Sequence, residues 1–148
     1  MTNIHALLVG INDYSPEVGA LRGCVNDVGL MQEYLRSSYK ENQLRIETLT
    51  DADATRDNII SQFRNHLAKA GESDVVLFQF AGHGARWSSA DEFRHLFPDG
   101  KDEGLVCYDS RKNGQYDLAD KELAVLLAEV AAQNPHITVL LDCCHSGS

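Results

Sequence analysis

The chain has 148 residues, a length typical of one domain that buries a sizeable core. Hydrophobic residues make up 43% of it and charged residues 24%, as in ordinary globular proteins, and no apolar run approaches the ~20 residues that a membrane-spanning helix needs. The formal net charge of −9 argues against nucleic-acid binding, which needs a basic face, and is compatible with a cationic substrate or a divalent cation.

The first half of the chain alternates between strand and helix patterns. A short apolar run at residues 5–9 predicts a strand that ends at Gly10. Apolar positions three and four residues apart then predict a helix over residues 25–39. Residues 44–49 alternate with the period of a strand, and residues 55–70 again have the spacing of a helix.

The second half continues the alternation but contains a long polar segment. Residues 74–80 are almost all apolar, which is typical of a strand buried on both faces of a parallel sheet. A polar stretch follows over residues 86–117, with a small strand predicted at residues 104–108. Residues 118–132 predict a third helix, and residues 137–141 predict the fourth major strand. Loops as long as this polar stretch are commonly functional or disordered.

The order of these elements predicts the fold class. Strands that alternate with helices form parallel sheets with helices on both faces. We therefore expect one α/β domain over residues 1–148, with a parallel-rich sheet. The first strand leads to Gly10-Ile11-Asn12 and not to a Gly-x-Gly-x-x-Gly loop, so the sequence has no glycine-rich nucleotide loop there.

Reactive side chains follow two of the predicted strands. One strand leads into Ala81-Gly82-His83-Gly84, and the last strand leads into Asp142-Cys143-Cys144-His145-Ser146-Gly147. The carboxyl ends of neighbouring parallel strands meet at one edge of a sheet, which is where sites form. An imidazole beside a thiol can take its proton and leave the thiolate that nucleophilic catalysis needs. Either residue alone is an ordinary structural residue, but the two together predict a Cys/His nucleophile pair.

Two adjacent cysteines compete for the role of nucleophile. Successive side chains of a strand point to opposite faces, so only one of Cys143 and Cys144 can meet His83. Cys143 is closer to the apolar run and is expected to be the more buried, so we favour Cys144. The backbone N–H of Gly84 is the predicted donor to a developing oxyanion.

These motifs resemble the two catalytic motifs of the metacaspases, a branch of the caspase-like cysteine peptidases. The opening Leu8-Val9-Gly10-Ile11-Asn12-Asp13-Tyr14, followed by Leu21-Arg22-Gly23-Cys24-Val25-Asn26-Asp27, is similar to the N-terminal signature of that family. The Gln-Ala-Cys-Arg-Gly signature of the caspases proper is absent from the sequence. The resemblance implies the large-subunit portion of a prokaryotic-type, caspase-like cysteine endopeptidase. It also implies a thioester intermediate, with His83 as general base and acid and Cys144 as nucleophile.

The resemblance further implies an acidic pocket that selects Arg or Lys at the P1 position of the substrate. The matching positions are Cys24, Asp27 and Asp142. Carboxylates in a pocket pair well with a guanidinium or an ammonium group. The structural alternative for Asp27 is a favourable carboxylate in the first turn of a helix. Ala81 stands where many relatives have Ser, which removes one possible polar contact from the pocket.

The segment Asp99-Gly100-Lys101-Asp102-Glu103 is similar to the acidic segment with which many metacaspases bind activating calcium. Carboxylates suit this hard cation, although the spacing is not that of an EF-hand. We therefore expect Asp99, Asp102 and Glu103 to bind Ca²⁺, the alternative being a solvated acidic loop. The chemistry itself requires no cofactor. A zinc site is disfavoured because adjacent cysteines cannot easily share one tetrahedral ion and there is no Cys-x-x-Cys pair.

The expected partners are a peptide or protein substrate with a basic P1 residue and a C-terminal small-subunit fragment or partner chain. In the family, further strands follow the catalytic cysteine and complete the sheet and the pocket, so the resemblance implies an incomplete sheet after Cys144. A self-cleavage fragment, a truncated chain and half of a split enzyme all agree with this expectation. The resemblance also implies activation by self-processing.

Two further expectations concern compartment and function. The start of the chain lacks the basic residues and apolar stretch of a signal peptide, and the four cysteines form no disulfide framework. We therefore expect a cytoplasmic protein with reduced thiols. The alternative function, from another class, is a catalytically silent caspase-like scaffold or binding module. The presence of both His83 and Cys144 argues against it.

Overall fold

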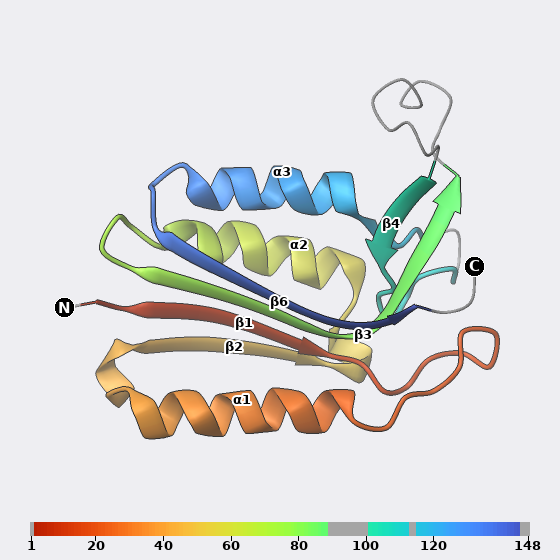
Figure 1. Cartoon of the computed structure of the whole chain (residues 1–148), viewed down its shortest axis with the longest axis horizontal. Coiled ribbons are helices and arrows are strands. Elements are labelled where there is room, and N and C mark those ends of the chain that lie inside the picture. The colour runs from red at the N-terminus through yellow and green to blue at the C-terminus, as the bar shows by residue number, and fades with distance from the viewer. Residues whose placement is uncertain (1, 89–100, 113–114, 146–148) are drawn as a thin grey trace.

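The computed structural model describes residues 2–88, 101–112 and 115–145, of which residues 86–88, 101–103 and 144–145 are described by their backbone alone. The described residues form a sheet of six strands in the order β2-β1-β3-β4-β5, with β6 paired to β3 (Figure 1). Four strands run parallel, namely β1 (Ile4–Gly10), β2 (Leu44–Thr50), β3 (Val75–Ser88) and β6 (His136–His145). The short strands β4 (Lys101–Leu105) and β5 (Leu118–Ala119) are antiparallel.

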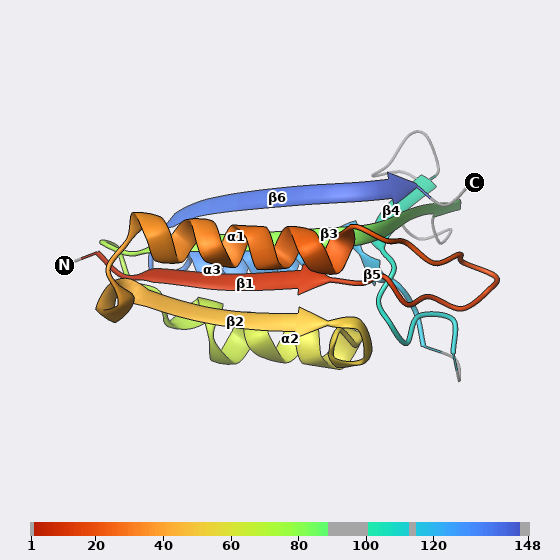
Figure 2. The ribbon, with the colours of Figure 1, turned by 90° about the horizontal axis from the view of Figure 1, so that it is seen from below.

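Helices cover both faces of this sheet, as expected. Helix α1 (Cys24–Ser38) lies on one face, and α2 (Arg56–Asn65) and α3 (Asp120–Ala131) lie on the other. Figure 2 shows the parallel strands in the order β6, β3, β1 and β2, with α1 nearest the viewer. Among the described residues, no helix has the length and apolar character to cross a bilayer.

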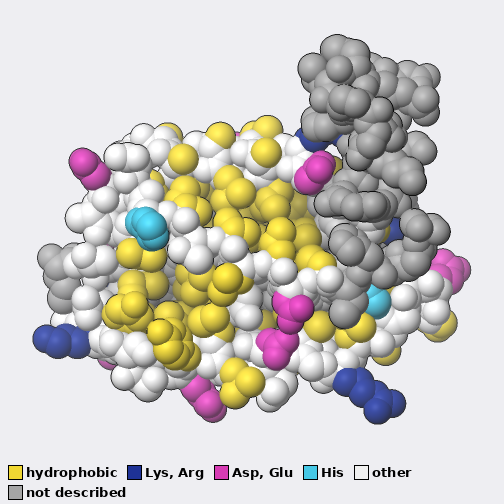
Figure 3. Space-filling model, in the orientation of Figure 1, with side chains coloured by type: hydrophobic (Ala, Val, Ile, Leu, Met, Phe, Trp, Pro, Cys, Tyr) yellow, Lys and Arg dark blue, Asp and Glu magenta, His cyan; other side chains and the backbone are white. Residues whose placement is uncertain are grey.

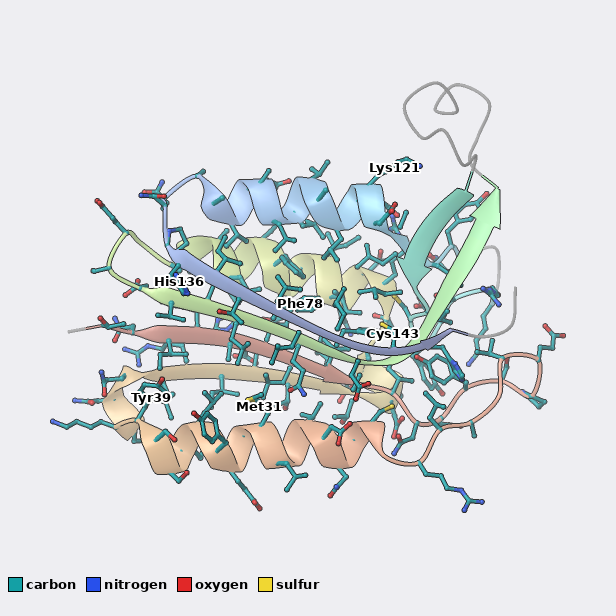
Figure 4. The ribbon with its side chains drawn as sticks, in the orientation of Figure 1. Met31, Tyr39, Phe78, Lys121, His136 and Cys143 are labelled. Carbon is teal, nitrogen blue, oxygen red and sulfur yellow. The ribbon has the colours of Figure 1, made fainter. Side chains whose placement is uncertain are left out.

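Strands β1 and β3 are apolar on both faces because each face of the sheet has its own core. On the α1 side, Leu8 and Leu77 pack with Val28, and on the other side Phe78 packs against α2, with the rings of Phe63 and Phe78 4.8 Å apart. In Figure 4 the side chain of Phe78 points from β3 towards α2. Burial on both faces explains why the strand patterns read as nearly continuous apolar runs.

Two strands are longer than their sequence patterns predict. Strand β3 continues past Phe80 and through His83 to Ser88, although the apolar run ends at Phe80. The continuation is stabilised by antiparallel pairing with β4, which starts at Lys101 and so begins earlier than the strand predicted at residues 104–108. The last strand likewise continues beyond the predicted residues 137–141. Both extensions depend on partner strands that are distant in sequence, and local periodicity contains no information about such partners.

The second predicted helix is interrupted. It begins after Thr55, whose Oγ1 accepts the N–H of Asn58 at 3.2 Å and caps the first turn. It ends at Asn65, and a separate 3₁₀ turn follows at Leu67–Lys69. At the break, Nε2 of His66 lies 2.9 Å from the carbonyl oxygen of Ala6 on β1. This contact ties the end of α2 to the sheet, and the expected single helix over residues 55–70 is therefore wrong after Asn65.

Candidate active site

The candidate residues gather at the carboxyl edge of the parallel sheet. Pairing between β1 and β3 ends at Gly10–Ala81, whereas pairing between β3 and β6 continues to Gly84–His145. In that ladder His83 is the register partner of Cys144, and Gly82 is the partner of Cys143. Sixty-odd residues of sequence thus separate two positions that lie on directly hydrogen-bonded strands.

Strand alternation separates the two cysteines. Cys143 is half-buried and packs, like Val139, against the core on the α2 and α3 side. Figure 4 places it near the carboxyl end of β6. Val75 and Leu77 of β3 pack in the α1-side core, so position 83, which has the same parity, belongs to the α1 side. By the same alternation, position 144 of β6 shares the face of His83 and position 143 does not.

The surroundings of Cys143 are mostly apolar. It lines a cavity of about 230 Å³ beneath the start of α3, together with four leucines, two glycines and one carboxylate: Leu105, Leu118, Leu123, Leu141, Gly84, Gly104 and Asp120. An apolar lining disfavours a charged thiolate. Cys107 is even more enclosed, and burial raises the pKa of its thiol to about 12. Among the described residues, no Lys, Arg or His side chain lines the cavity around Cys143, whereas reactive cysteines have electropositive surroundings.

The imidazole of His83 is buried and held by the loop between β1 and α1. Its Nε2 lies 2.8 Å from the carbonyl oxygen of Gly19, and only 8% of the residue is exposed. A carbonyl oxygen can only accept, so Nε2 carries the proton and donates it to Gly19. In the neutral ring this leaves the lone pair on Nδ1, the nitrogen that can accept a proton from a nucleophile. Gly19 has a φ of +97°, a conformation that glycine adopts without strain.

Tyr14 is a site residue to which the sequence analysis assigned no role. Its ring lies against the imidazole of His83, with centroids 4.8 Å apart and planes at 59°. Its hydroxyl accepts the backbone N–H of His83 at 3.0 Å and donates to the carbonyl oxygen of Val106 at 2.8 Å. Tyr14 belongs to the N-terminal motif, but a tyrosine in a polar turn has no periodicity that would reveal a buried role.

The same loop is anchored at both ends. Oδ1 of Asn12 accepts the N–H groups of Cys24 at 2.9 Å and Val25 at 3.4 Å, and so caps the start of α1. Oδ1 of Asp51, beyond β2, accepts the N–H groups of Asn12 at 2.8 Å and Asp13 at 2.9 Å. These bonds give the loop a defined path past the end of β3.

The predicted specificity positions lie close to one row across the sheet. Gly10 pairs with Ala81, and Ala81 pairs with Asp142. A Cβ added to Gly10 would lie 2.7 Å from the carbonyl oxygen of Cys24, so α1 begins directly over this row. Cys24 and Asp27 are half-buried in the first turn of α1, and Asp142 is exposed on β6.

The predicted calcium ligands are only partly described. Asp99 lies outside the described residues. The backbones of Asp102 and Glu103 lie in β4, in register with Trp87 and Arg86, and therefore not in a loop as expected. Adjacent positions of a strand belong to opposite faces of the sheet. Within the part of the chain that the structure describes, no three His, Cys, Asp or Glu side chains are grouped to hold a metal ion.

Gly84, the predicted oxyanion donor, lies where two ladders meet. It pairs with Leu105 of β4 on one side and with His145 of β6 on the other. The Gly84–His145 pair is the last one described between β3 and β6. Gly84 therefore belongs to both ladders in this structure.

The fold and this arrangement of the carboxyl edge define a caspase-like α/β domain. A solved structure, protein GSU0716 from Geobacter sulfurreducens, is similar to it with a TM-score of 0.76 and 28% sequence identity. The alignment covers 99% of this chain and 52% of that one.

The sequence model of the metacaspase, peptidase C14 domain matches residues 5–148, and the chain belongs to the metacaspase family. It is 37% identical over 147 residues to "Metacaspase III c" of Phaeodactylum tricornutum and 32% identical over 149 residues to "Metacaspase-1" of Pyricularia oryzae. Both alignments cover 97% of this chain, but they span 42% and 36% of the two relatives. The chain thus spans less than half the length of these relatives. The expected family and fold class are confirmed.

Proposed function

We propose that this chain carries the catalytic residues of a cysteine endopeptidase that cleaves after Arg or Lys, with Cys144 as nucleophile and His83 as general base and acid. The observation that supports it most strongly is the register pair His83–Cys144 on adjacent strands at the carboxyl edge. The apolar cavity around Cys143 and the burial of Cys107 support the choice of Cys144 among the cysteines.

In the proposed reaction, Nδ1 of His83 takes the thiol proton of Cys144, and the thiolate attacks the carbonyl carbon of the scissile peptide bond. The tetrahedral intermediate collapses as the imidazolium returns the proton to the leaving amine, and a thioester remains on Cys144. Water then attacks the thioester with His83 again as base, which releases the carboxylate product and restores the thiol. The hydrogen bond from Nε2 to the Gly19 carbonyl oxygen holds the ring in place during these proton transfers.

The oxyanion of the intermediate requires a donor, and we assign this role to the N–H of Gly84, the residue after the base. Preorganised donors of this kind often contribute the largest share of catalysis in acyl transfer. In this structure Gly84 pairs with His145. The assignment therefore requires this last β3–β6 pair to open when a substrate binds.

The preference for Arg or Lys is assigned to Asp27 and Asp142, with Cys24 beside them. The row from Cys24 over Gly10 and Ala81 to Asp142 supports this assignment, because it brings these positions to the edge that carries His83. A basic P1 side chain there would form charge-assisted hydrogen bonds with the carboxylates. The net charge of −9 favours the approach of such substrates.

Calcium activation is a separate proposal, with Asp99, Asp102 and Glu103 as ligands. Because Asp102 and Glu103 are neighbours in β4, one ion bound by both requires the first residues of β4 to leave the strand. Calorimetric titration with Ca²⁺, with Mg²⁺ as the control ion, tests it. We expect Asp102→Asn and Glu103→Gln each to weaken Ca²⁺ binding, and full activity in excess chelator would contradict the proposal.

We also propose that a C-terminal small-subunit segment or partner chain pairs with β6 and that self-processing separates the two parts. Within the described residues β6 pairs only with β3, and Leu140 and Leu141 on it are 42% and 49% exposed. Figure 3 shows apolar side chains gathered over this edge of the sheet. An apolar strand with an unpaired edge favours pairing with another strand. Intact-mass analysis of the natural protein, with a Cys144→Ala variant as control, tests self-processing.

A cytoplasmic location is part of the same proposal. The sequence supports it, because the spacing of the four cysteines is not that of a disulfide framework. Fractionation of the source cells, followed by detection of the protein, tests this directly. Recovery from an oxidising compartment would contradict it.

The decisive test of the activity uses fluorogenic peptides with Arg, Lys or Asp at P1, with the C-terminal part supplied in one set of assays. We expect turnover of the Arg and Lys peptides, its loss in Cys144→Ala, and near wild-type turnover in the matched control Cys143→Ala. Activity that depends on Cys143 would overturn the assignment. An absence of turnover with Ca²⁺ and the C-terminal part present would favour the scaffold or binding module.

A further inference from the structure

Strand β3 changes partners at the candidate base. On one side it pairs with β1 as far as Ala81, and on that same side it pairs with β4 from Gly84 onward. Gly82 and His83 lie between the two ladders. The gap is occupied by Tyr14, which reaches it from the loop between β1 and α1.

The hydroxyl of Tyr14 replaces a hydrogen bond of the sheet. The register Gly84–Leu105 continues to His83 opposite Val106, and the N–H of Val106 donates to the carbonyl oxygen of His83 at 2.9 Å. In an antiparallel ladder such a pair normally exchanges two hydrogen bonds. The second bond of this pair, from the N–H of His83 directly to the carbonyl oxygen of Val106, is absent here. The N–H of His83 donates to Oη of Tyr14 at 3.0 Å, and that hydroxyl donates to the carbonyl oxygen of Val106 at 2.8 Å.

The first glycine of the Gly-His-Gly motif makes room for this hydroxyl. A Cβ added to Gly82 would lie 2.5 Å from Oη of Tyr14 and 3.0 Å from two ring atoms of Phe80. A separation of 2.5 Å is shorter than any normal contact, so a side chain at position 82 would displace the hydroxyl. Gly82 and Tyr14 are therefore complementary, and the motif is explained in part by the protein's own packing.

The hydroxyl is a permanent part of this link. Burial raises the pKa of Tyr14 far above its usual range, so the group stays protonated and serves as donor and acceptor at once. The same loop holds the other end of His83 through the Gly19 carbonyl oxygen. One loop thus holds the main chain of His83 through Tyr14 and its ring through both Tyr14 and Gly19.

We propose that Tyr14 is a positioning residue for His83, which sets the place of the imidazole by linking its main chain to Val106. The catalytic part of this inference rests on the proposed function. The structural part, a hydroxyl inserted into the β3–β4 ladder, stands on the hydrogen bonds alone. Misplacement of a catalytic group by about 1 Å can cost about 100-fold in rate, so loss of the link is expected to act on kcat.

The test is Tyr14→Phe, which keeps the ring and removes only the hydroxyl. We expect kcat to fall at least 10-fold with little change in KM, and the pH–rate profile to shift. We also expect faster hydrogen exchange at the His83 amide, measured by NMR, because its acceptor is gone. Tyr34→Phe is the matched control, since Tyr34 is 60% exposed on α1 and the same atom is removed. It should leave all these quantities unchanged.

A second pair of variants keeps the test decisive if Tyr14→Phe folds poorly. Gly82→Ala should reduce kcat and speed exchange at the His83 amide, because the new methyl displaces the hydroxyl. In the double variant Gly82→Ala with Tyr14→Phe, the clash with Oη no longer exists. The fold-loss in kcat of the double variant should therefore be much smaller than the product of the fold-losses of the two single variants.

Unchanged kcat, pH profile and His83 exchange in folded Tyr14→Phe would overturn the proposal, as would independent effects of the two substitutions. If the wild-type protein hydrolyses no peptide, the proposed function fails, and exchange at the His83 amide still decides whether Tyr14 holds this strand. The two failures are thereby distinguishable.

Discussion

The carbonyl oxygen of Gly19 lies 2.8 Å from Nε2 of His83. This bond selects the tautomer of the imidazole, because a carbonyl oxygen accepts only from a protonated nitrogen. It also links the orientation of a ring on β3 to the backbone conformation of a residue 64 positions earlier in the chain. The conformation at Gly19 is therefore expected to affect the chemistry of His83.

Gly19→Ala tests this link. The site of the added methyl is open, with no atom within 4 Å, so the effect comes from the φ of +97° alone. A left-handed conformation costs an L-residue about 1–2 kcal/mol, which the loop can relieve by turning the carbonyl away from His83. We expect kcat to fall about tenfold or more, since catalysis is sensitive to small misplacements. Steady-state kinetics with an Arg peptide measure it.

Gly29→Ala is the control for this prediction. Gly29 lies within α1, also with no atom within 4 Å of an added methyl, and its φ is not positive. Alanine is the better helix former, so this variant should gain about 0.5–1 kcal/mol in free energy of unfolding and keep its kcat. Equal loss of activity in both variants would show that the Gly19 conformation has no special role.

Gly10→Ala should move the start of α1. The added Cβ would lie 2.7 Å from both the carbonyl oxygen of Cys24 and Cγ2 of Val28, and neither the backbone nor the packed side chain can yield freely. We expect the free energy of unfolding to fall by about 1–3 kcal/mol, as for other overpacked sites. We also expect a higher KM for Arg peptides, since the first turn of α1 carries Cys24 and Asp27.

Urea denaturation and kinetics together measure this prediction. Gly23→Ala is the matched control, because Gly23 precedes α1 and an added methyl there meets nothing within 4 Å. A stable Gly10→Ala protein with unchanged KM would contradict the predicted coupling between this helix and the specificity positions.

Asp142→Asn should reduce the preference for a basic P1 residue. Hydrogen bonds to charged groups contribute about 1.5–3 kcal/mol, which corresponds to about 10- to 100-fold in kcat/KM for an Arg peptide. For a peptide with the neutral isostere citrulline at P1, kcat/KM should fall much less. Glu72→Gln has the same effect on net charge at an exposed position before β3, on the opposite edge of the sheet, and serves as control. Parallel losses for Arg and citrulline peptides would argue against a role of Asp142 in specificity.

The stability of the fold is expected to decrease below neutral pH because of His5. Burial lowers the pKa of His5 below its usual value of 6.5, although the nearby Asp74, 3.4 Å from Nε2, partly opposes this. The unfolded chain then binds the proton more readily than the folded one. Stability due to His5 is therefore present above pH 6.5 and is lost as the pH falls towards the lower folded pKa.

Denaturation of the wild type and of His5→Gln at a series of pH values between 7 and 5 measures this effect. The free energy of unfolding of the wild type should fall more steeply with decreasing pH than that of the variant. If the free energy of unfolding has the same slope against pH in both proteins, the imidazole of His5 titrates alike in the folded and unfolded states.

The sequence by itself determined the type and order of the main elements. Periodicity depends on neighbours along the chain, so the runs around Leu8 and Phe78 predict strands, and the apolar stripe of α1 predicts a helix, without knowledge of the fold. The motifs around His83 and Cys144 likewise identified the metacaspase family, which the comparisons confirm.

Only the tertiary structure decided how these elements meet. The extension of β3 through His83 depends on β4, and the face that position 144 shares with His83 depends on the register with β6. Tyr14 is the clearest case, because its two hydrogen bonds span 69 and 92 residues of sequence. Register and such distant bonds follow from the packing of whole strands, and no local pattern encodes them.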